Sequence, residues 1–184
     1  MSPTMTRACV LIDACAIIDI CEVGWWDRIV RACELVVPSY VVEEADYYVG
    51  PEGWREVIDL DSYVCGGKVA MLRAAPDEML TLRDVFTRTK LEAIDPGEAE
   101  ALALIHVGQA DGHLYCSTDG HAIECLALMG KSEVGVSLQA LLSRLGYTLP
   151  QGAPRKCCQD FFDYHLRMGR EQRIRCQGIV QPPI

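Results

Sequence analysis

Four acidic residues have the type and the placement to do chemistry together: Asp13, Glu44, Glu98 and Asp119. Asp13 and Asp119 each end a short apolar run, whereas Glu44 and Glu98 each lie early in a predicted helix. In a parallel α/β sheet these two kinds of position meet at one edge, where ligands bind. An Asp buried there is costly unless a cation or hydrogen-bond donors meet it. Carboxylates that share a pocket repel one another, which raises their pKa values, and hard divalent cations relieve that repulsion.

The apolar runs predict the strands that would position these acids. Cys9 to Ile12 is wholly apolar and shows no periodicity, which is typical of a strand buried on both faces of a parallel sheet. Leu35 to Val37 and Leu114 to Cys116 are similar short runs. Helical patterns lie between and after them, the last from about Val136 to Leu145. The alternation of strands and helices predicts an α/β fold.

The helix after the second run orients Glu44. Ser39 is a good N-cap for this helix. At about 100° per residue, Glu44 lies about 60° from Val41, at the border of the apolar face, while Glu43 points almost the opposite way. Glu44 is therefore able to reach a crevice at the sheet edge, and Glu43 should be solvated. An ordinary carboxylate at the border of the apolar face is an equally good interpretation of Glu44.

Ordinary structural roles are also available to the other acids. Asp95 is a good N-cap for a helix that runs to about residue 107, and Glu98 would complete its capping box. Glu100 cannot share the face of Glu98, so at most one of the two joins a cluster with Asp13. Asp119 would serve equally as the N-cap of the helix predicted over residues 122–129. The joint placement of the acids, rather than any one of them, points to a site.

Composition narrows the class of protein. At 184 residues the chain is long enough for one domain with a real core, and half of its residues are apolar, which argues against disorder. It shows no secretory signal and no apolar run of membrane-spanning length, so we expect a cytoplasmic protein without a membrane partner. The ten cysteines lack C-x-x-C pairs, and several lie inside apolar runs, which indicates small buried residues in a reducing compartment.

Taken in order, the motifs resemble the PIN domain family, over roughly residues 8 to 149. The resemblance lies in five stretches: Val10–Asp13, Val37–Glu44, Pro96–Ala103, Cys116–Asp119 and Gly130–Leu142. It implies a three-layer α/β/α domain with a central, mainly parallel sheet that binds Mg²⁺ or Mn²⁺ and hydrolyses RNA. By position, the implied catalytic and metal-binding set is Asp13, Glu44, Glu98 and Asp119.

The family chemistry needs no side-chain nucleophile. One ion lowers the pKa of a water that attacks the phosphodiester, and a second, about 4 Å away, stabilises the leaving oxygen. The chain departs from the family pattern at two places. Ala14 and Cys15 follow Asp13 where Thr and a small polar residue are frequent, and Gly120 follows Asp119 where a second acidic residue is common.

The resemblance also implies partners. RNA is the expected substrate. Many small prokaryotic members are toxins of toxin–antitoxin pairs, held by a partner that blocks the crevice, and dimers are common in the family. An antitoxin protein and a second copy of the chain are therefore the other partners to consider.

We expect residues 1–149 to form the PIN-like domain. Within it, residues 49–90 are an insertion or cover segment whose structure the patterns leave open. Val57 to Leu60 suits a strand, and Met79 to Lys90 suits either a helix or an extended segment.

Residues 150–184 form a basic C-terminal extension beyond the resemblance. Residues 151–184 hold six Lys and Arg against three Asp and Glu, a charge of +3. The net charge of the whole chain is −9, so the rest of the chain carries −12. We predict a short helix over Cys157 to Met168. An acidic body does not attract nucleic acid by bulk charge, so this extension is the only stretch that favours a polyanion.

Two other functions compete with a nuclease. The first is a PIN-fold binding module with weak or no catalysis, which the acidic body and the two departures favour, because a fold alone does not give a function. The second is a haloacid-dehalogenase-like phosphotransferase with Asp13 as nucleophile. Such sites need a second Asp where this chain has Cys15, and no basic residue is placed as its partner in the sequence.

Overall fold

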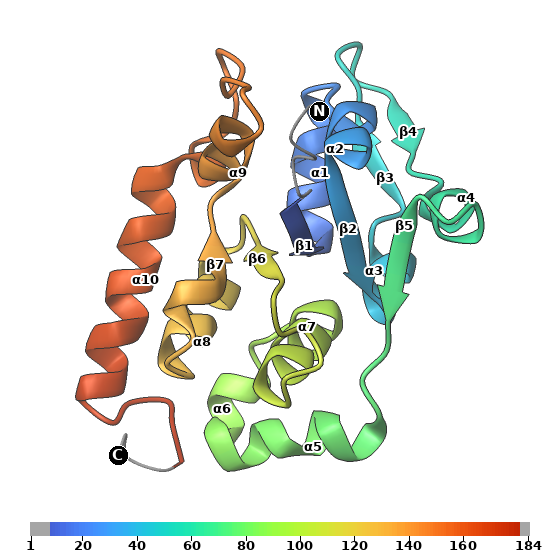
Figure 1. Cartoon of the computed structure of the whole chain (residues 1–184). Helices are drawn as coiled ribbons and strands as arrows, with labels where there is room; N and C mark the ends of the chain where they lie inside the picture. The colour runs from blue at the N-terminus through green and yellow to red at the C-terminus, as the bar shows by residue number, and fades with distance from the viewer. Residues whose placement is uncertain (1–7, 181–184) are drawn as a thin grey trace, which may run out of the picture.

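The computed structural model describes residues 8–180, and a sheet of five parallel strands lies at their centre (Figure 1). The strand order is β5-β2-β1-β6-β7. Val10 of β1 pairs with Leu35 of β2 on one side and with Leu114 of β6 on the other, so β1 is the middle strand. The strands are β1 (Ala8–Ile12), β2 (Cys33–Pro38), β5 (Val69–Leu72), β6 (Leu114–Cys116) and β7 (Gly135–Val136). The predicted α/β class with a parallel central sheet is confirmed.

Helices cover both faces of the sheet and make three layers. Val10 and Ile12 of β1 pack into one apolar core, and Leu11 between them packs into the other. This explains why the first strand shows no alternation of apolar and polar residues. The first core includes residues of α1 (Ala14–Glu22), α2 (Trp26–Ala32) and α9 (Leu138–Arg144). The second includes residues of α5 (Pro76–Val85), α7 (Pro96–His106) and α8 (Gly120–Leu128).

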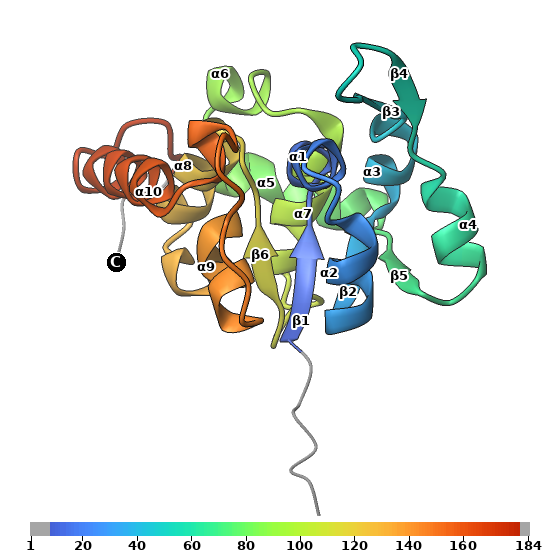
Figure 2. The ribbon, with the colours of Figure 1, turned by 90° about the horizontal axis from the view of Figure 1, so that it is seen from above.

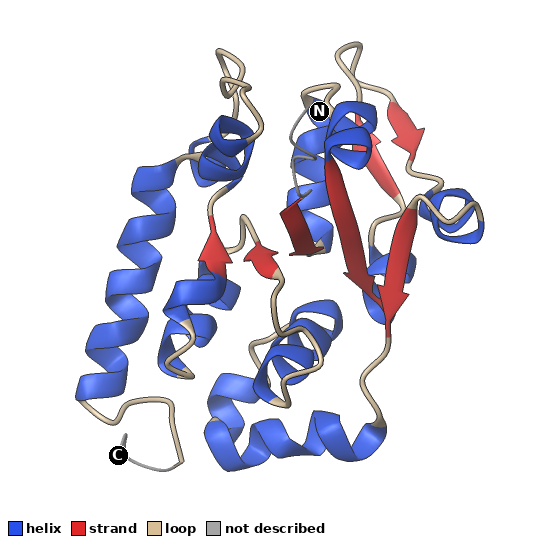
Figure 3. Cartoon of the chain, viewed as in Figure 1, coloured by secondary structure: helices blue, strands red, loops and turns tan. Residues whose placement is uncertain are grey.

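The segment that the sequence left open has mixed structure. Strands β3 (Tyr47–Val49) and β4 (Arg55–Val57) form a separate antiparallel hairpin, and both are among the strands drawn in red in Figure 3. The strand expected over Val57 to Leu60 is wrong, because α4 (Leu60–Cys65) begins there after Asp59 caps it. The ambiguity over Met79 to Lys90 is resolved as α5 and a short α6 (Arg88–Leu91).

The C-terminal extension packs against the body of the protein. It contains a 3₁₀ turn, η2 (Arg155–Cys157), and α10 (Gln159–Ile174), which is longer than predicted and lies along α8 (Figure 2). The two helices approach closely at Gly169, where a Cβ atom would lie 2.3 Å from the Glu124 carbonyl oxygen. After α10 the chain returns to the end of α5, where Ile179 forms an antiparallel bridge with Phe86. No helix among residues 8–180 is long and apolar enough to cross a membrane.

Candidate functional site

Asp13 lies directly after the central strand and begins α1. Its Oδ1 atom accepts a hydrogen bond of 2.7 Å from the backbone amide of Ala16, which caps the helix. Its Oδ2 atom is buried and has no hydrogen-bond partner among the described residues. The side chain is only 1% exposed, so bulk solvent does not reach this oxygen to stabilise a charge.

The environment of Asp13 favours the protonated carboxyl group. The pKa of Asp13 is raised to about 7, chiefly by burial and in addition by the nearby carboxylates of Asp119 and Asp19, while the Ser117 hydroxyl and the Ala16 amide act in the opposite direction. A carboxyl group with a pKa near neutrality, orphaned at the end of a central strand, is a site candidate on physical grounds.

Glu98 lies in the first turn of α7 and is 6% exposed. Burial raises its pKa to about 8, with further contributions from Asp119, Asp13 and Asp95. The reciprocal capping box that would have explained its spacing is not formed, because the Asp95 side chain makes no capping bond. The Asp95 amide lowers the pKa of Glu98, but by less than burial and the neighbouring carboxylates raise it. Glu98 is thus a buried acid in electrostatic contact with both strand-end aspartates.

Asp119 repeats the arrangement of Asp13 at the next strand. It follows β6 closely and caps α8, with Oδ1 accepting hydrogen bonds from the amides of His121 (2.6 Å) and Ala122 (3.1 Å). The Ser117 hydroxyl accepts a hydrogen bond from the Asp119 amide, which fixes the turn. Asp119 is therefore an N-cap, as the structural interpretation of the sequence had it, and its second oxygen remains available for another partner.

A cavity of about 310 Å³ joins Asp13 to Glu44 and Glu98. Asp95 adds a fourth carboxylate to its lining, and the other walls come from Ala14, Cys15, Ile18 and Pro96. Glu44 lies at the end of α3 (Ser39–Glu44), and its Oε1 accepts a 2.9 Å hydrogen bond from the Gly97 amide. Partial burial raises the pKa of Glu44. Asp119 does not line this cavity, and it acts electrostatically on Asp13 and Glu98.

Gly97 permits the contact between α3 and α7 that brings Glu44 to the cavity. A Cβ atom there would lie 2.2 Å from Glu44 Oε2. Glu43, on the other side of α3, is exposed, and the structure shows no hydrogen bond or ion pair to it from the described residues. The helix therefore presents Glu44, and not Glu43, to the acidic cavity.

Glu100 is buried as deeply as Asp13 but serves to hold the fold together. Its carboxylate accepts hydrogen bonds from the Ser39 hydroxyl (2.8 Å), the Tyr40 amide (2.8 Å) and the Ala74 amide (3.0 Å). The N-cap expected at Ser39 is wrong for this reason: Pro38 is the N-cap, and the Ser39 hydroxyl binds Glu100 instead. Of the two glutamates in the first turns of α7, only Glu98 lines the acidic cavity.

Three residues that the sequence did not single out as site residues surround the cluster. Asp19, on α1, is 1% exposed and accepts a 2.6 Å hydrogen bond from the Thr118 hydroxyl. Lys156 Nζ lies 2.9 Å from the other oxygen of Asp19, in an ion pair. The one sequence signal was that Asp19 interrupts the apolar residues of α1; nothing in the sequence linked it to Lys156, 137 positions later.

The donor set suits a hard divalent cation. The candidate set, Asp13, Glu44, Glu98 and Asp119, offers oxygen ligands, which Mg²⁺ and Mn²⁺ prefer. The buried Oδ2 of Asp13, which has no hydrogen-bond partner among the described residues, is the kind of atom that a cation would bind. Within residues 8–180, no three His, Cys, Asp or Glu side chains stand close enough together to hold a metal as they are placed. The chemistry of the residues therefore fits such an ion, and binding one requires the carboxylates to turn toward it.

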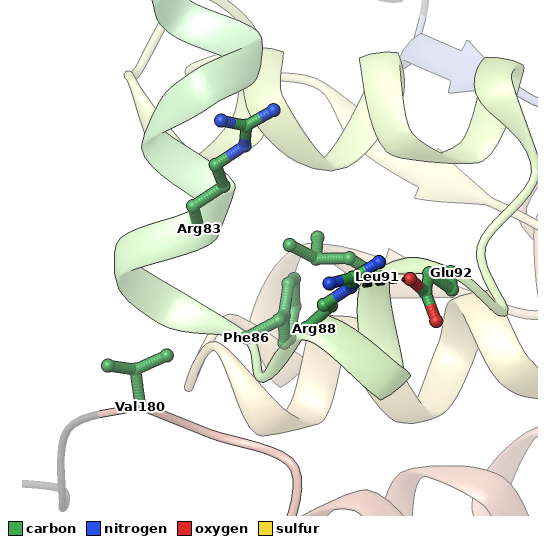
Figure 4. A pocket seen from close by; sticks show the side chains of 6 residues that line it. All are labelled: Arg83, Phe86, Arg88, Leu91, Glu92 and Val180. Atoms are coloured by element: carbon green, nitrogen blue, oxygen red, sulfur yellow. Dashed lines mark hydrogen bonds and ion pairs between the residues drawn. The ribbon is translucent and has the colours of Figure 1, made fainter.

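A second cavity, of about 570 Å³, lies where α5, α6 and the segment after α10 meet (Figure 4). Arg83 and Arg88 project at its rim, and Phe86, Leu91 and Val180 provide apolar walls. The Arg88 guanidinium is paired with Glu92 at 2.7 Å, and both are well exposed. The acid in the lining of this cavity, Glu92, is paired with Arg88, so the cavity lacks a cluster of acids. We therefore place the candidate site at the cavity that Asp13 lines.

Comparison of the chain with known protein families, with curated proteins and with solved structures gave no match. The case for a function therefore rests on the arrangement of these side chains.

Proposed function

We propose that the protein is a metal-dependent ribonuclease of the PIN-like kind, which hydrolyses RNA phosphodiester bonds at the acidic cavity. The observation that carries the proposal is the pair formed by Asp13 and Glu98: two buried carboxyl groups, with pKa values of about 7 and 8, that line one cavity. Each of the two carboxyl groups opposes the ionisation of the other, so their burial in one cavity lowers the stability of the fold. A role in function accounts for their placement, whereas a purely structural role does not.

Asp13, Glu44, Glu98 and Asp119 are the residues that would hold Mg²⁺ or Mn²⁺. A bound ion supplies an activated water and charge stabilisation for attack on a phosphodiester. The helix amides that bind Oδ1 of Asp13 and of Asp119 anchor one oxygen of each side chain and leave the second oxygen to meet the ion. Glu98 and Glu44 enter from two other helices and complete the cavity wall.

A catalytically weak binding module is a second candidate, and the residue after Asp119 favours it. The ring of His165, on α10, occupies the space beside Gly120, and a Cβ atom at residue 120 would lie 2.4 Å from it. A second acidic side chain at that position would require the His165 ring of the C-terminal extension to move. A nuclease of this kind must work with the four acids alone.

Incubation of the purified protein with a mixed pool of RNAs, with and without Mn²⁺, tests the proposal. We expect fragments only when Mn²⁺ is present, and loss of the fragments when a chelator removes it. The Asp13→Asn variant, prepared in parallel, guards against a contaminating nuclease. RNA that stays intact in Mn²⁺ with the wild-type chain would instead favour the binding module.

Glu44 and Glu43 provide a matched pair of variants. Glu44→Gln should lower the cleavage rate by about tenfold or more, because it removes one charge from the cavity wall. Glu43→Gln removes the same charge from the solvated side of the same helix and should change the rate by less than about twofold. Initial rates at saturating Mn²⁺ measure both effects. The opposite ranking would show that α3 does not present Glu44 to the reaction.

A further inference from the structure

The ion pair between Lys156 and Asp19 ties the C-terminal extension to the acidic site. Lys156 lies in η2, and its ammonium group is 2.9 Å from Asp19 Oδ1. The two members differ in exposure: the side chain of Asp19 is 1% exposed and that of Lys156 is 41% exposed. The buried carboxylate therefore holds the ammonium group of a side chain that is itself partly exposed to solvent.

Lys156 also lies beside the acidic cavity. Cys15 lines that cavity, and the same thiol is within electrostatic range of Asp13, Asp119, Glu98 and Lys156. On α1, Cys15 and Asp19 are separated by one helical turn and so lie on neighbouring parts of one face. The positive charge thus lies about one turn of α1 from the cavity wall, and it acts on the same thiol as Asp13, Asp119 and Glu98 do.

A substrate with a phosphate backbone needs a cation at this place. The chain outside residues 151–184 carries a charge of −12, and the cavity itself collects carboxylates, so an RNA strand meets repulsion as it approaches. An ammonium group has three donors, and the pairing with Asp19 occupies one side of it. The remaining donors suit a phosphate oxygen, and the Asp19 carboxylate restricts the side chain before the substrate arrives.

We propose that Lys156 binds a phosphate group of the RNA next to the scissile bond, so that the C-terminal extension supplies the substrate-binding cation of the site. This inference rests on the proposed function, since it assigns a residue to the binding of the same substrate. Asp19 is then a positioning residue: it orients Lys156 on one side and, through the Thr118 hydroxyl, the turn that carries Asp119 on the other.

Removal of Lys156 alone would leave a buried carboxylate without its partner and destabilise the fold. The test therefore compares two variants in which Asp19 is already neutral. Both carry Asp13→Asn, so that RNA is bound and not cut, together with Asp19→Asn; one of them also carries Lys156→Met. A third variant, with the same two background substitutions, carries Lys68→Met in place of Lys156→Met and is the matched control. It removes the same charge at the amino end of β5, the opposite edge of the sheet.

Binding of a single-stranded oligoribonucleotide in Mg²⁺ is measured over a series of salt concentrations. We expect Lys156→Met to weaken binding by about fivefold at low salt and to reduce the slope of log affinity against log salt by about 0.7. The Lys68→Met control should change neither quantity by as much. Equal affinities and slopes with and without Lys156 would overturn the proposal, as would failure of the variant that retains Lys156 to bind RNA.

Kinetics of the active protein separate this inference from the proposed function. With Asp19→Asn as the common background, Lys156→Arg should keep KM within about twofold, because the charge is retained, whereas Lys156→Met should raise KM more than it lowers kcat. If the wild-type chain cleaves RNA and Lys156→Met leaves both KM and the salt slope unchanged, only the role of Lys156 is wrong. If no RNA is cleaved but the salt slopes differ as expected, the nuclease proposal fails and the phosphate contact stands.

Discussion

Replacement of Asp13 by Asn is expected to lower the rate of Mn²⁺-dependent RNA cleavage by at least about a hundredfold. The amide oxygen of Asn can still accept the hydrogen bond from the Ala16 amide, so α1 keeps its N-cap. The orphaned Oδ2, however, is replaced by a neutral NH₂ group, which cannot bind a cation. The change therefore removes the charge from the cavity without removing the helix cap.

The same substitution should leave the protein folded, with a melting temperature equal to or above that of the wild type at pH 8. Burial raises the pKa of Asp13 to about 7, so at pH 8 the wild-type residue holds a poorly solvated charge that Asn lacks. Circular dichroism and the cleavage rate together check both parts. Asp119→Asn should likewise lower the cleavage rate and leave the protein folded. Full activity of either folded variant would contradict the assignment.

The stability of the metal-free protein is expected to fall as the pH rises from 6.5 to 8.5. The folded-state pKa values of Asp13 and Glu98 are about 7 and about 8, against ordinary values of 3.8 and 4.5. Throughout this window the unfolded chain has lost both protons while the folded chain still holds part of them. Because the folded state binds more protons, the free energy of unfolding decreases with pH.

The size of this effect follows from the two pKa values. Summed over the window, the loss is on the order of 2–3 kcal/mol, which corresponds to a decrease in Tm of about 5–10 °C for a chain of this length. The window begins at pH 6.5 because burial lowers the pKa of His121, and that group acts in the opposite direction in more acidic solution.

Mg²⁺ should reverse the trend, because it binds the deprotonated carboxylates and so stabilises the folded state more at pH 8.5 than at pH 6.5. Thermal melts in a chelator and in excess Mg²⁺ give both curves. Glu98→Gln, which removes the group with the higher pKa, should flatten the curve in the chelator. A Tm of the metal-free protein that rises between pH 6.5 and pH 8.5 would contradict the placement of Asp13 and Glu98 as two buried acids in one cavity.

Sequence patterns were sufficient to locate the two strand-end aspartates. An apolar run that lacks periodicity and ends in Asp leaves few alternatives to a buried parallel strand with its carboxylate at the ligand edge, and the structure places Asp13 and Asp119 there. The phase of α3 similarly distinguished Glu44 from Glu43. Both inferences depend on local geometry, which a few neighbouring residues determine.

Contacts between distant segments could not be predicted in the same way. Glu98 and Glu100 have the same side chain two positions apart, and only the donors that surround Glu100, from α3 and the loop after β5, assign it to the fold. The ion pair of Asp19 with Lys156 joins α1 to a segment near the other end of the chain. Strand β5 also escaped notice, because it is an edge strand with two exposed residues and lacks the fully buried character of the other runs.

Titration of the protein with Mn²⁺, followed by the resonance signal of the free ion, tests the central claim most directly, because it needs neither an RNA substrate nor a catalytic rate. We predict that the wild-type chain removes one or two Mn²⁺ ions from solution, that Asp13→Asn and Glu98→Gln remove far fewer at the same concentration, and that Glu43→Gln matches the wild type. A wild-type chain that leaves the Mn²⁺ signal unchanged, or an Asp13→Asn chain that binds as the wild type does, would contradict the account.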